Sequence, residues 1–498
     1  MQTLPMKLSK QQNNSKQRNL LFLLSDEHDP RYMKCSGAEW MHTPNLDELA
    51  ARGTRFTNAY TPSPICVPAR ASLATGHWAH TNGYWDNAIA YDGRWASWHH
   101  RLANAGVRVE SIGKLHYRSK DDPTGFLAQH EAVHILDGIG LVWGSVRDPL
   151  PQTRGRSPIF DEIGAGESSY NRYDAKVTHL ACDWLQQRGQ EGPDAEPWAL
   201  FVGLVAPHMP LVVPQEWLDL YPADQIPPHK SLPADLPRHP WVERLKQHWD
   251  HDAMLGDDEK RRLARACYFG LVSFMDAQVG RIIEMLDAQG LRDSTTIIYS
   301  SDHGDNLGAR GLWNKSTLYR ESTSIPMIIS GPGVPQSHIC HTNVNLIDIY
   351  PTALSACKVP LLPEERNLPG TSLLTLANQP DDFERIGFSE YHAVGSESAA
   401  YMLTSQGFKY HHYVGHPPEL FCLESDPEEL FNLANDITYA HVLERMEKLL
   451  RDMLDPVAID HLAKRDQNNL IAKFGGREKA LASGNAGPTP MHEKYRML

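Results

Sequence analysis

The chain has 498 residues, enough for one large domain with a smaller one beside it. With 41% hydrophobic and 22% charged residues it has the composition of a globular protein, and its formal net charge of -13 argues against nucleic acid or an anionic membrane surface as the main partner. Its seven cysteines are scattered and show no C-x-x-C spacing, so we expect a reducing compartment and a cytoplasmic protein.

The N-terminal part of the chain predicts a polar tail followed by a buried strand. Residues 1–18 are rich in Gln, Asn, Lys and Ser, and we expect them to be disordered. They lack the apolar core of a signal peptide, and no apolar run in the chain is long enough to span a membrane. Residues 20–24 are uniformly apolar, as in a parallel strand buried on both faces, and they lead into Asp26 and Glu27.

A helix is predicted to begin beside Cys66, because Pro68 suits the first turn of a helix but not its interior. Arg70 follows Cys66 by about one helical turn, so the thiol and the guanidinium should face the same way. The free N–H groups and the dipole of this first turn favour an anion, but the dipole contributes only about 0.3–1 kcal/mol. Binding a dianion here therefore requires further cations.

Two further strands are predicted to end in polar residues. Residues 107–112 lead into Lys114 and His116, which should point to the same side if the chain stays extended. Residues 198–205 form a buried strand that ends near His208. Residues 120–195, between these strands, are irregular, and we expect them to form loops over the rim of the active site.

The second half of the domain repeats this pattern. A long helix with an apolar stripe is predicted over about residues 260–289, and the strand at 295–300 ends in Asp302 and His303, with Lys315 downstream. Because ligands in open α/β sheets bind beyond the carboxyl ends of the strands, we expect these polar strand ends to meet at one edge.

Beyond about residue 375 the pattern changes to short strands joined by turns, at 386–391, 400–404 and 408–412, followed by a helix at about 439–454. We therefore expect a catalytic domain over 19–375 and a smaller C-terminal subdomain over 376–498. The last thirty residues are polar and contain Gly and Pro, which is compatible with an arm that contacts another subunit of a homo-oligomer.

The pattern Cys66-x-Pro68-x-Arg70, followed by Thr75-Gly76, resembles the signature of type I sulfatases in the alkaline phosphatase superfamily. The resemblance implies an α/β fold with a large central, mostly parallel sheet flanked by helices, and a small C-terminal antiparallel α+β subdomain. It also implies that a maturation enzyme converts Cys66 to formylglycine, whose hydrate is the nucleophile. Ala69 departs from the family's commonest pattern and matches phosphonate monoester hydrolases.

The same resemblance extends to the strand ends. Gly-Lys114-x-His116 and Pro-His208-x-Pro repeat sulfatase motifs, while Asn87 and His303 match choline sulfatases and phosphonate monoester hydrolases. The resemblance implies a catalytic set of Cys66, Arg70, Lys114, His116, His208 and Lys315, a substrate-binding set of Asn87, Lys114, His208 and Lys315, and a metal site of Asp26, Glu27, Cys66, Asp302 and His303.

A divalent cation would offset the crowded carboxylates of this site. Calcium or manganese is favoured, with magnesium and zinc as alternatives, because oxygen ligands suit calcium or magnesium and a His ligand favours manganese or zinc. In the implied mechanism the metal acidifies one hydroxyl of the hydrate, which attacks sulfur. Arg70, Lys114 and Lys315 stabilise the sulfate oxygens. His208 or Lys315 assists the departing alcohol, and His116 deprotonates the remaining hydroxyl so that sulfate is expelled.

The resemblance thus implies a sulfuric ester hydrolase acting on a small-molecule sulfate ester. A phosphodiesterase or phosphonate monoester hydrolase on the same scaffold is an alternative, favoured by Ala69 and His303 and opposed by Lys114 with His116. A non-catalytic anion-binding protein is a remote alternative. The alcohol half of the substrate stays open between aryl, choline-like and sugar sulfates. The aromatic stretch over residues 84–98 could line a substrate pocket or pack in the core.

Overall fold

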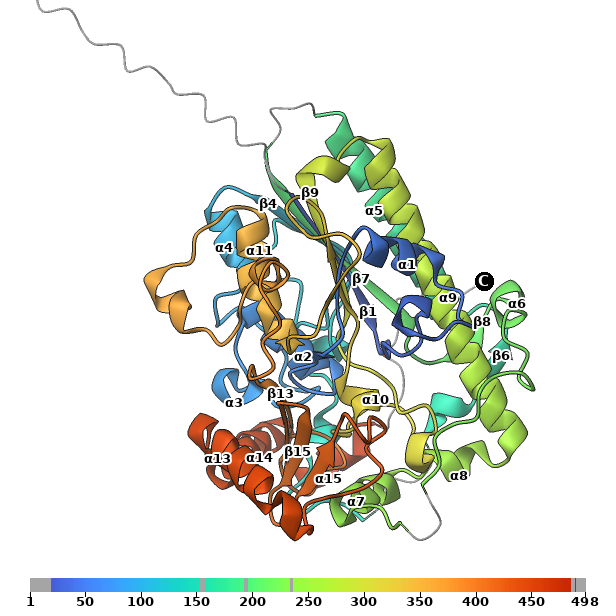
Figure 1. Ribbon diagram of the computed structural model, residues 1–498, viewed down its shortest axis with the longest axis vertical. Coiled ribbons are helices and arrows are strands. Elements are labelled where there is room, and N and C mark those ends of the chain that lie inside the picture. Colours follow the sequence, from blue (N-terminus) through green and yellow to red (C-terminus); the bar gives the residue numbers. More distant parts are fainter. Residues whose placement is uncertain (1–18, 153–156, 192–195, 233–235, 485–488, 490–498) are drawn as a thin grey trace, which may run out of the picture.

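The structure is a computed structural model that describes residues 19–152, 157–191, 196–232, 236–484 and 489 (Figure 1). The tail predicted over 1–18 and the end of the predicted C-terminal arm lie outside the described residues.

An eight-stranded sheet forms the centre of the molecule, with strand order β11-β2-β10-β9-β1-β7-β4-β5. The five strands from β9 to β5 run parallel, whereas β10 is antiparallel to both of its neighbours. This confirms the predicted mostly parallel sheet. The strands are β1 (Asn19–Asp26), β2 (Gly53–Phe56), β4 (Arg108–Lys114), β5 (Ala128–Val133), β7 (Trp198–Pro207), β9 (Thr295–Ser301), β10 (Met327–Ser330) and β11 (His338–Cys340).

Helices cover both faces of this sheet, which is why its central strands are apolar without alternation. Side chains of β1 alternate between two cores: Phe22 packs with α2, α4 and α11, and Leu23 packs with α1, α5 and α9 (Figure 1). The helices are α1 (Pro44–Ala51), α2 (Cys66–Thr75), α4 (Trp98–Asn104), α5 (Ser169–Gly189), α9 (Asp258–Ala288) and α11 (Ile349–Ala356).

The prediction that residues 120–195 are loops is wrong for two segments. Residues 128–133 form the edge strand β5, and residues 169–189 form α5, a helix of 21 residues. The helix begins at a capping box in which the Ser168 hydroxyl accepts a hydrogen bond from the Asn171 backbone N–H at 3.1 Å. Only a narrow apolar stripe of α5, including Val177 and Leu185, faces the sheet, so its polar faces obscured the helical pattern.

The predicted C-terminal antiparallel sheet is confirmed, and its four strands follow one another in order. Helix α13 (Ala440–Met453) packs on it where a helix was predicted, at the orange and red end of the chain in Figure 1. The boundary near residue 375 stays a prediction. The strands are β13 (Gly387–Tyr391), β14 (Ala400–Ser405), β15 (Phe408–Tyr413) and β16 (Glu419–Cys422).

The arm predicted for the last thirty residues is wrong for its first part, because residues 469–474 end helix α14 (Pro456–Phe474) and residues 477–482 form helix α15 (Arg477–Ala482). Ile471 and Ala480 of these helices pack against Val142, in the 3-10 helix η3 (Val142–Ser145). Polar residues on the outer faces of α14 concealed its contact with the catalytic domain. Homo-oligomer formation stays a prediction.

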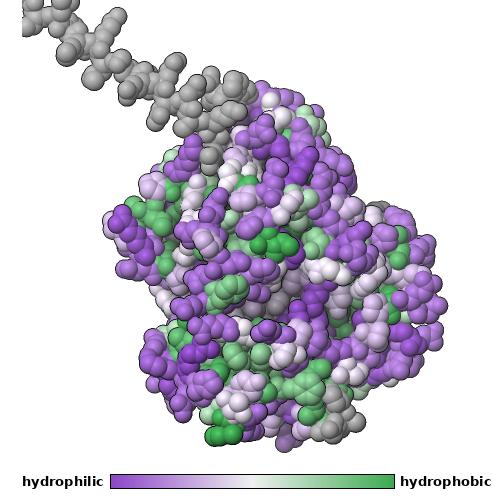
Figure 2. Space-filling view, viewed as in Figure 1, coloured by the Kyte–Doolittle hydropathy of each residue, from purple (hydrophilic) through white to green (hydrophobic). Residues whose placement is uncertain are grey.

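On the face in Figure 2, hydrophobic residues are scattered among hydrophilic ones. No helix within the described ranges combines the length and the apolar composition that a membrane crossing requires.

Shorter elements complete the chain. They are α3 (Ala79–Asn82), α6 (Gln215–Leu218), α7 (Pro240–His248), α8 (His251–Leu255), α10 (Arg320–Thr323), α12 (Leu373–Leu376), β3 (Ala59–Tyr60), β6 (Ile163–Ala165), β8 (Leu211–Val213) and β12 (Val344–Asn345).

Candidate active site

The polar strand ends meet at one edge of the sheet, as the sequence predicts. Strands β1 and β9 pair in parallel with Ser25 opposite Ser301, so Asp26 and Asp302 follow directly at neighbouring strand ends. Lys114 ends β4, and His208 follows the end of β7. The sheet itself therefore places acidic and basic groups over the start of α2.

Helix α2 begins at Cys66 and is buried along its whole length. The Cys66 Sγ atom lies 3.8 Å from Asp26 Oδ1 and 3.1 Å from His303 Nε2. One turn later, Arg70 donates from Nε to Asp302 Oδ2 at 2.8 Å and from Nη2 to Asp26 Oδ2 at 2.9 Å. The guanidinium thus holds both carboxylates in place beneath the thiol.

Four buried side chains bring one donor atom each to within 4.8 Å of the others. His303 donates from Nδ1 to the Gly304 carbonyl at 3.0 Å, so its Nε2 carries a lone pair that faces the Cys66 sulfur and can bind a cation. The arrangement fits a divalent metal ion, because two buried carboxylates and an imidazole lone pair converge beside the sulfur. We call these residues the metal group: Asp26, Cys66, Asp302 and His303.

Glu27 stands apart from the metal group and shares a second set of close donors with Asp26 and His208. Its Oε2 accepts a hydrogen bond from Lys315 Nζ at 3.0 Å and lies 3.4 Å from His208 Nε2. Burial raises the pKa of Glu27 to about 8, although the Lys315 ammonium opposes the shift. Glu27 therefore links Lys315 and His208 on this side of the site.

Lys114 and His116 both reach the site, but the geometry predicted for them is wrong. The Lys114 ammonium lies 2.6 Å from Asp26 Oδ2. His116 has a φ of 54°, so the chain turns into the left-handed region instead of remaining extended. Glu27, with a φ of 69°, is a second site residue in this unfavourable region. Backbone strain thus concentrates beside Cys66.

Burial and neighbouring charges shift the pKa values of three site residues, Asp26, Cys66 and His116. Burial raises the pKa of Asp26, but Lys114, His208 and Arg70 outweigh it and hold that pKa well below its usual range. Burial and the Asp26 carboxylate raise the pKa of the Cys66 thiol to about 12. Burial and Lys114 lower the pKa of His116 well below its ordinary value, so this imidazole is neutral at pH 7.

A pocket opens over Cys66, and the remaining predicted residues line it. Asn87 accepts a hydrogen bond from the Val67 backbone N–H at 3.3 Å, next to Cys66. His116, His208 and Lys315 also line the pocket. The structure therefore brings every predicted site residue to one place.

Several lining residues were not predicted. The aromatic residues of 84–98 mostly pack in the core: Tyr91 and Trp98 are fully buried there. The aromatic lining comes instead from Trp143, Trp249 and Trp313, which are far apart in the sequence. Thr489 places its hydroxyl 2.9 Å from His116 Nε2. Nothing in the local pattern of the chain distinguishes these residues, because only the tertiary fold gathers them.

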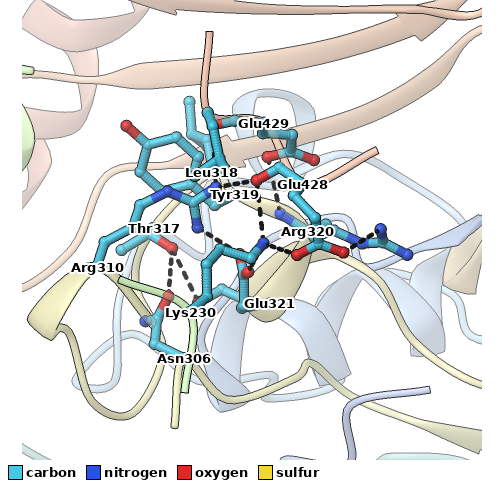
Figure 3. A network of polar contacts seen from close by, with 12 residues as sticks. Lys230, Asn306, Arg310, Thr317, Leu318, Tyr319, Arg320, Glu321, Glu428 and Glu429 are labelled. Carbon is cyan, nitrogen blue, oxygen red and sulfur yellow. Dashed lines mark hydrogen bonds and ion pairs between the residues drawn. The ribbon is translucent and has the colours of Figure 1, made fainter. Parts of the chain in front are cut away.

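A buried ion network supports the loop that carries Lys315. Glu321, fully buried, accepts from Lys230 Nζ at 2.5 Å and from Arg310 Nη1 at 2.9 Å. Figure 3 shows these side chains converging with Glu428 of the C-terminal subdomain, whose backbone carbonyl accepts from Arg310 Nη2 at 2.5 Å. The network therefore joins the catalytic domain to the C-terminal residues at the base of the Lys315 loop.

In the same view, the Thr317 hydroxyl donates to Asn306 Oδ1 at 3.0 Å (Figure 3). The Asn306 amide in turn donates to the Asn314 carbonyl at 2.5 Å and contacts the Lys315 carbonyl at 3.4 Å. These bonds fix the backbone on both sides of Lys315, and its ammonium is thereby directed toward Glu27.

The chain matches two known protein families. Residues 18–359 match the family described as Sulfatase, and residues 308–455 match the one described as N-sulphoglucosamine sulphohydrolase, C-terminal. A choline-sulfatase of Rhizobium meliloti is 31% identical over 434 residues, which cover 84% of this chain and 82% of that protein. An arylsulfatase K of Gallus gallus is 28% identical over 468 residues, covering 89% and 83%.

Solved structures with the same fold include two of direct interest. A phosphonate monoester hydrolase of Agrobacterium radiobacter matches with a TM-score of 0.71 and 22% identity, covering 87% of this chain and 95% of that one. A protein solved in complex with its substrate D-glucosamine-2-N,6-O-disulfate matches with a TM-score of 0.68 and 22% identity, covering 91% and 99%. These likenesses establish the fold, the central sheet together with the C-terminal antiparallel sheet.

Proposed function

Because this chain belongs to the sulfatase family of the alkaline phosphatase superfamily, we propose that it hydrolyses a small-molecule sulfate monoester to alcohol and sulfate, with residue 66 as nucleophile after conversion of its thiol to formylglycine. One observation carries the proposal: the side chain of Cys66 lies at the first turn of α2, within the metal group and beside Arg70 and Lys114. The conversion makes a formylglycine-generating enzyme a required partner.

A divalent cation on the metal group would supply the positive charge that lowers the pKa of the nucleophilic hydroxyl. Calcium or manganese suits the mixed carboxylate and imidazole donors best, with magnesium and zinc as alternatives. Glu27 as a direct ligand stays a prediction, since its carboxylate groups with His208. In our proposal Glu27 orients Lys315, and the network of Figure 3 holds the loop behind it.

The remaining residues divide into two roles. Arg70 and Lys114 fix the Asp26 carboxylate and place positive charge beneath the sulfate oxygens, where charge develops during attack. His208 donates from Nδ1 to the Met209 carbonyl at 2.7 Å, so its Nε2 faces Glu27. In this position His208 relays a proton to the departing alcohol, and Lys315 assists it. His116, neutral at pH 7, can accept the proton of the second hydroxyl.

A phosphonate monoester hydrolase is the second candidate, because Ala69 and His303 fit that group and a phosphonate monoester hydrolase shares the fold. Lys114 and His116 favour sulfate. The deciding assay compares 4-nitrophenyl sulfate with the 4-nitrophenyl monoester of phenylphosphonate, since both release the same alcohol. We expect a higher kcat/KM for the sulfate; a higher value for the phosphonate would reverse the assignment.

Cys66→Ala tests the nucleophile. This substitution should abolish turnover of 4-nitrophenyl sulfate, with Cys357→Ala, a buried cysteine outside the site, as the matched control. Retained turnover in Cys66→Ala would contradict the proposal. The cytoplasmic location expected from the cysteine pattern stays a prediction.

A further inference from the structure

The pocket over residue 66 has a wall that the chemistry at sulfur does not use. This wall lines the same pocket as Cys66, His208 and Lys315, so the alcohol half of an ester bound at residue 66 would lie against it. Trp249 contacts Trp143 edge to face, with ring centroids 5.1 Å apart, and lies nearly parallel to His251 at 6.0 Å. The apolar residues of this wall include Leu141, Trp143, Leu245, Trp249, Leu312 and Trp313.

The wall offers no open carboxylate to a cationic alcohol. Among the described lining residues only Asp86 carries a carboxylate, and both of its oxygens are occupied, by the Ala88 N–H at 2.9 Å and the Gln467 amide at 2.8 Å. The two lining ammonium groups are Lys246, paired with Asp250 at 2.6 Å, and Lys315, paired with Glu27 at 3.0 Å, so their carboxylate partners are occupied too. A quaternary ammonium bound here would lose water without gaining an ion-pair partner.

Three polar side chains of the lining, those of Asn306, Asn314 and Thr317, already form hydrogen bonds within the protein. The Asn306 amide bonds to Asn314 and Thr317, and the Asn314 amide donates to His251 Nδ1 at 3.3 Å. Few of their atoms remain for the hydroxyl groups of a sugar, each of which loses its hydrogen bonds to water on binding. A polyhydroxylated alcohol would therefore be poorly satisfied against this wall.

Two nitrogen atoms in the wall stay open. Neither Trp249 Nε1 nor His251 Nε2 has a hydrogen-bond partner among the described residues, although both atoms are buried. Because His251 accepts through Nδ1, its Nε2 carries the proton and donates. An apolar wall with one or two N–H donors suits a flat ring that bears a single acceptor atom.

We propose that the alcohol half of the substrate is an uncharged, apolar group of the aryl class, bound against Trp249 and Trp143. This inference rests on the proposed sulfatase function and deepens it. Ring contact and exclusion of water by the tryptophans give the affinity, while a positive charge would find no open carboxylate in the described lining to pair with.

A matched pair of alkyl esters tests the charge. Choline O-sulfate and 3,3-dimethylbutyl sulfate have the same shape and differ in one positive charge. We expect kcat/KM to be at least about tenfold higher for the neutral ester. The ammonium of choline makes its alcohol the better leaving group, so intrinsic reactivity works against this result. Equal values or a preference for choline O-sulfate would overturn the inference.

Phenyl sulfate and glucose 6-sulfate complete the panel, and we expect turnover of the first to exceed that of the second. A preference for the sugar ester would overturn the inference while leaving the sulfatase function intact. Absence of turnover with every sulfate, including 4-nitrophenyl sulfate, would overturn the proposed function and the inference with it.

Trp249→Ala should lower kcat/KM for phenyl and dimethylbutyl sulfate about tenfold and leave inhibition by inorganic sulfate unchanged, since only the alcohol contacts this ring. Trp249→Phe should retain most of the activity. Trp217→Ala, in α6 and packed against Phe274 outside the pocket, is the matched control, and melting temperatures show whether each variant folds. Unchanged kcat/KM in a folded Trp249→Ala would overturn the inference.

Discussion

Replacing Glu321 by Gln removes the carboxylate at the centre of the ion network in Figure 3 and keeps the size of the side chain. Glu321 is fully buried and pairs with Lys230, Arg310 and Arg31. Arg310 is 2% exposed, so the substitution leaves a buried guanidinium without its anion. Removing one partner of a buried ion pair typically costs about 3–5 kcal/mol. Two backbone carbonyls still bind Arg310, so we expect about 3 kcal/mol.

The assay measures the free energy of unfolding by urea titration. The control is Glu284→Gln, which changes an exposed glutamate of α9. Burial raises the pKa of Glu321, but Arg310, Lys230 and Arg31 outweigh it and hold the pKa well below its usual range. The folded-state pKa is depressed, so this stabilisation is present above the unfolded pKa and is lost as pH falls through the folded value. The difference between wild type and Glu321→Gln should therefore be constant between about pH 6 and 8 and shrink in acid. A difference below about 0.5 kcal/mol at pH 7 would refute the reasoning.

Three further predictions concern the site. His116→Ala should lower kcat about 100- to 10,000-fold and accumulate a sulfated enzyme visible by intact mass, whereas unchanged turnover without that species would remove His116 from the second step. Chelation with EDTA should abolish activity and lower the melting temperature, with both restored by calcium or manganese, and insensitivity to EDTA would count against the metal group. Thr489→Val should lower kcat/KM about two- to tenfold through the lost contact with His116, and an unaltered kcat/KM would show the contact to be passive.

Much of the fold was predictable because its central strands are apolar on both faces. The runs that became β1, β7 and β9 each end in a polar group, and a parallel sheet brings such ends together. The spacing of Cys66 and Arg70 likewise gave their common direction, confirmed by the contacts of both with Asp26. Here local pattern and tertiary structure agree.

The rest depended on contacts between distant segments. Helix α5 was missed because most of its surface is polar, and its short apolar stripe becomes visible only against β7. His116 reaches the site through a left-handed backbone conformation, and a histidine at that position does not predict one. Glutamate is an ordinary surface residue type, and only the fold buries Glu321 beside Arg310.

The pocket over Cys66 shows the same limit. Trp143, Trp249 and Thr489 come from η3, from the end of α7 and from the C-terminal segment, and only the packing of α14 and α15 on η3 brings that segment near the site. An aromatic-rich stretch is a poor guide to a pocket, since the aromatic residues of 84–98 mostly stabilise the core. Tryptophan serves both purposes, and its position in three dimensions decides between them.

The account depends on the chemical state of residue 66 in active protein. The most direct measurement is the mass of the peptide that contains residue 66, taken from protein whose turnover of a sulfate ester has just been recorded. We predict the mass of a formylglycine peptide, in which CHO replaces the CH2–SH side chain, with an occupancy that scales with activity across preparations. Full activity in protein whose Cys66 thiol is intact would contradict the account.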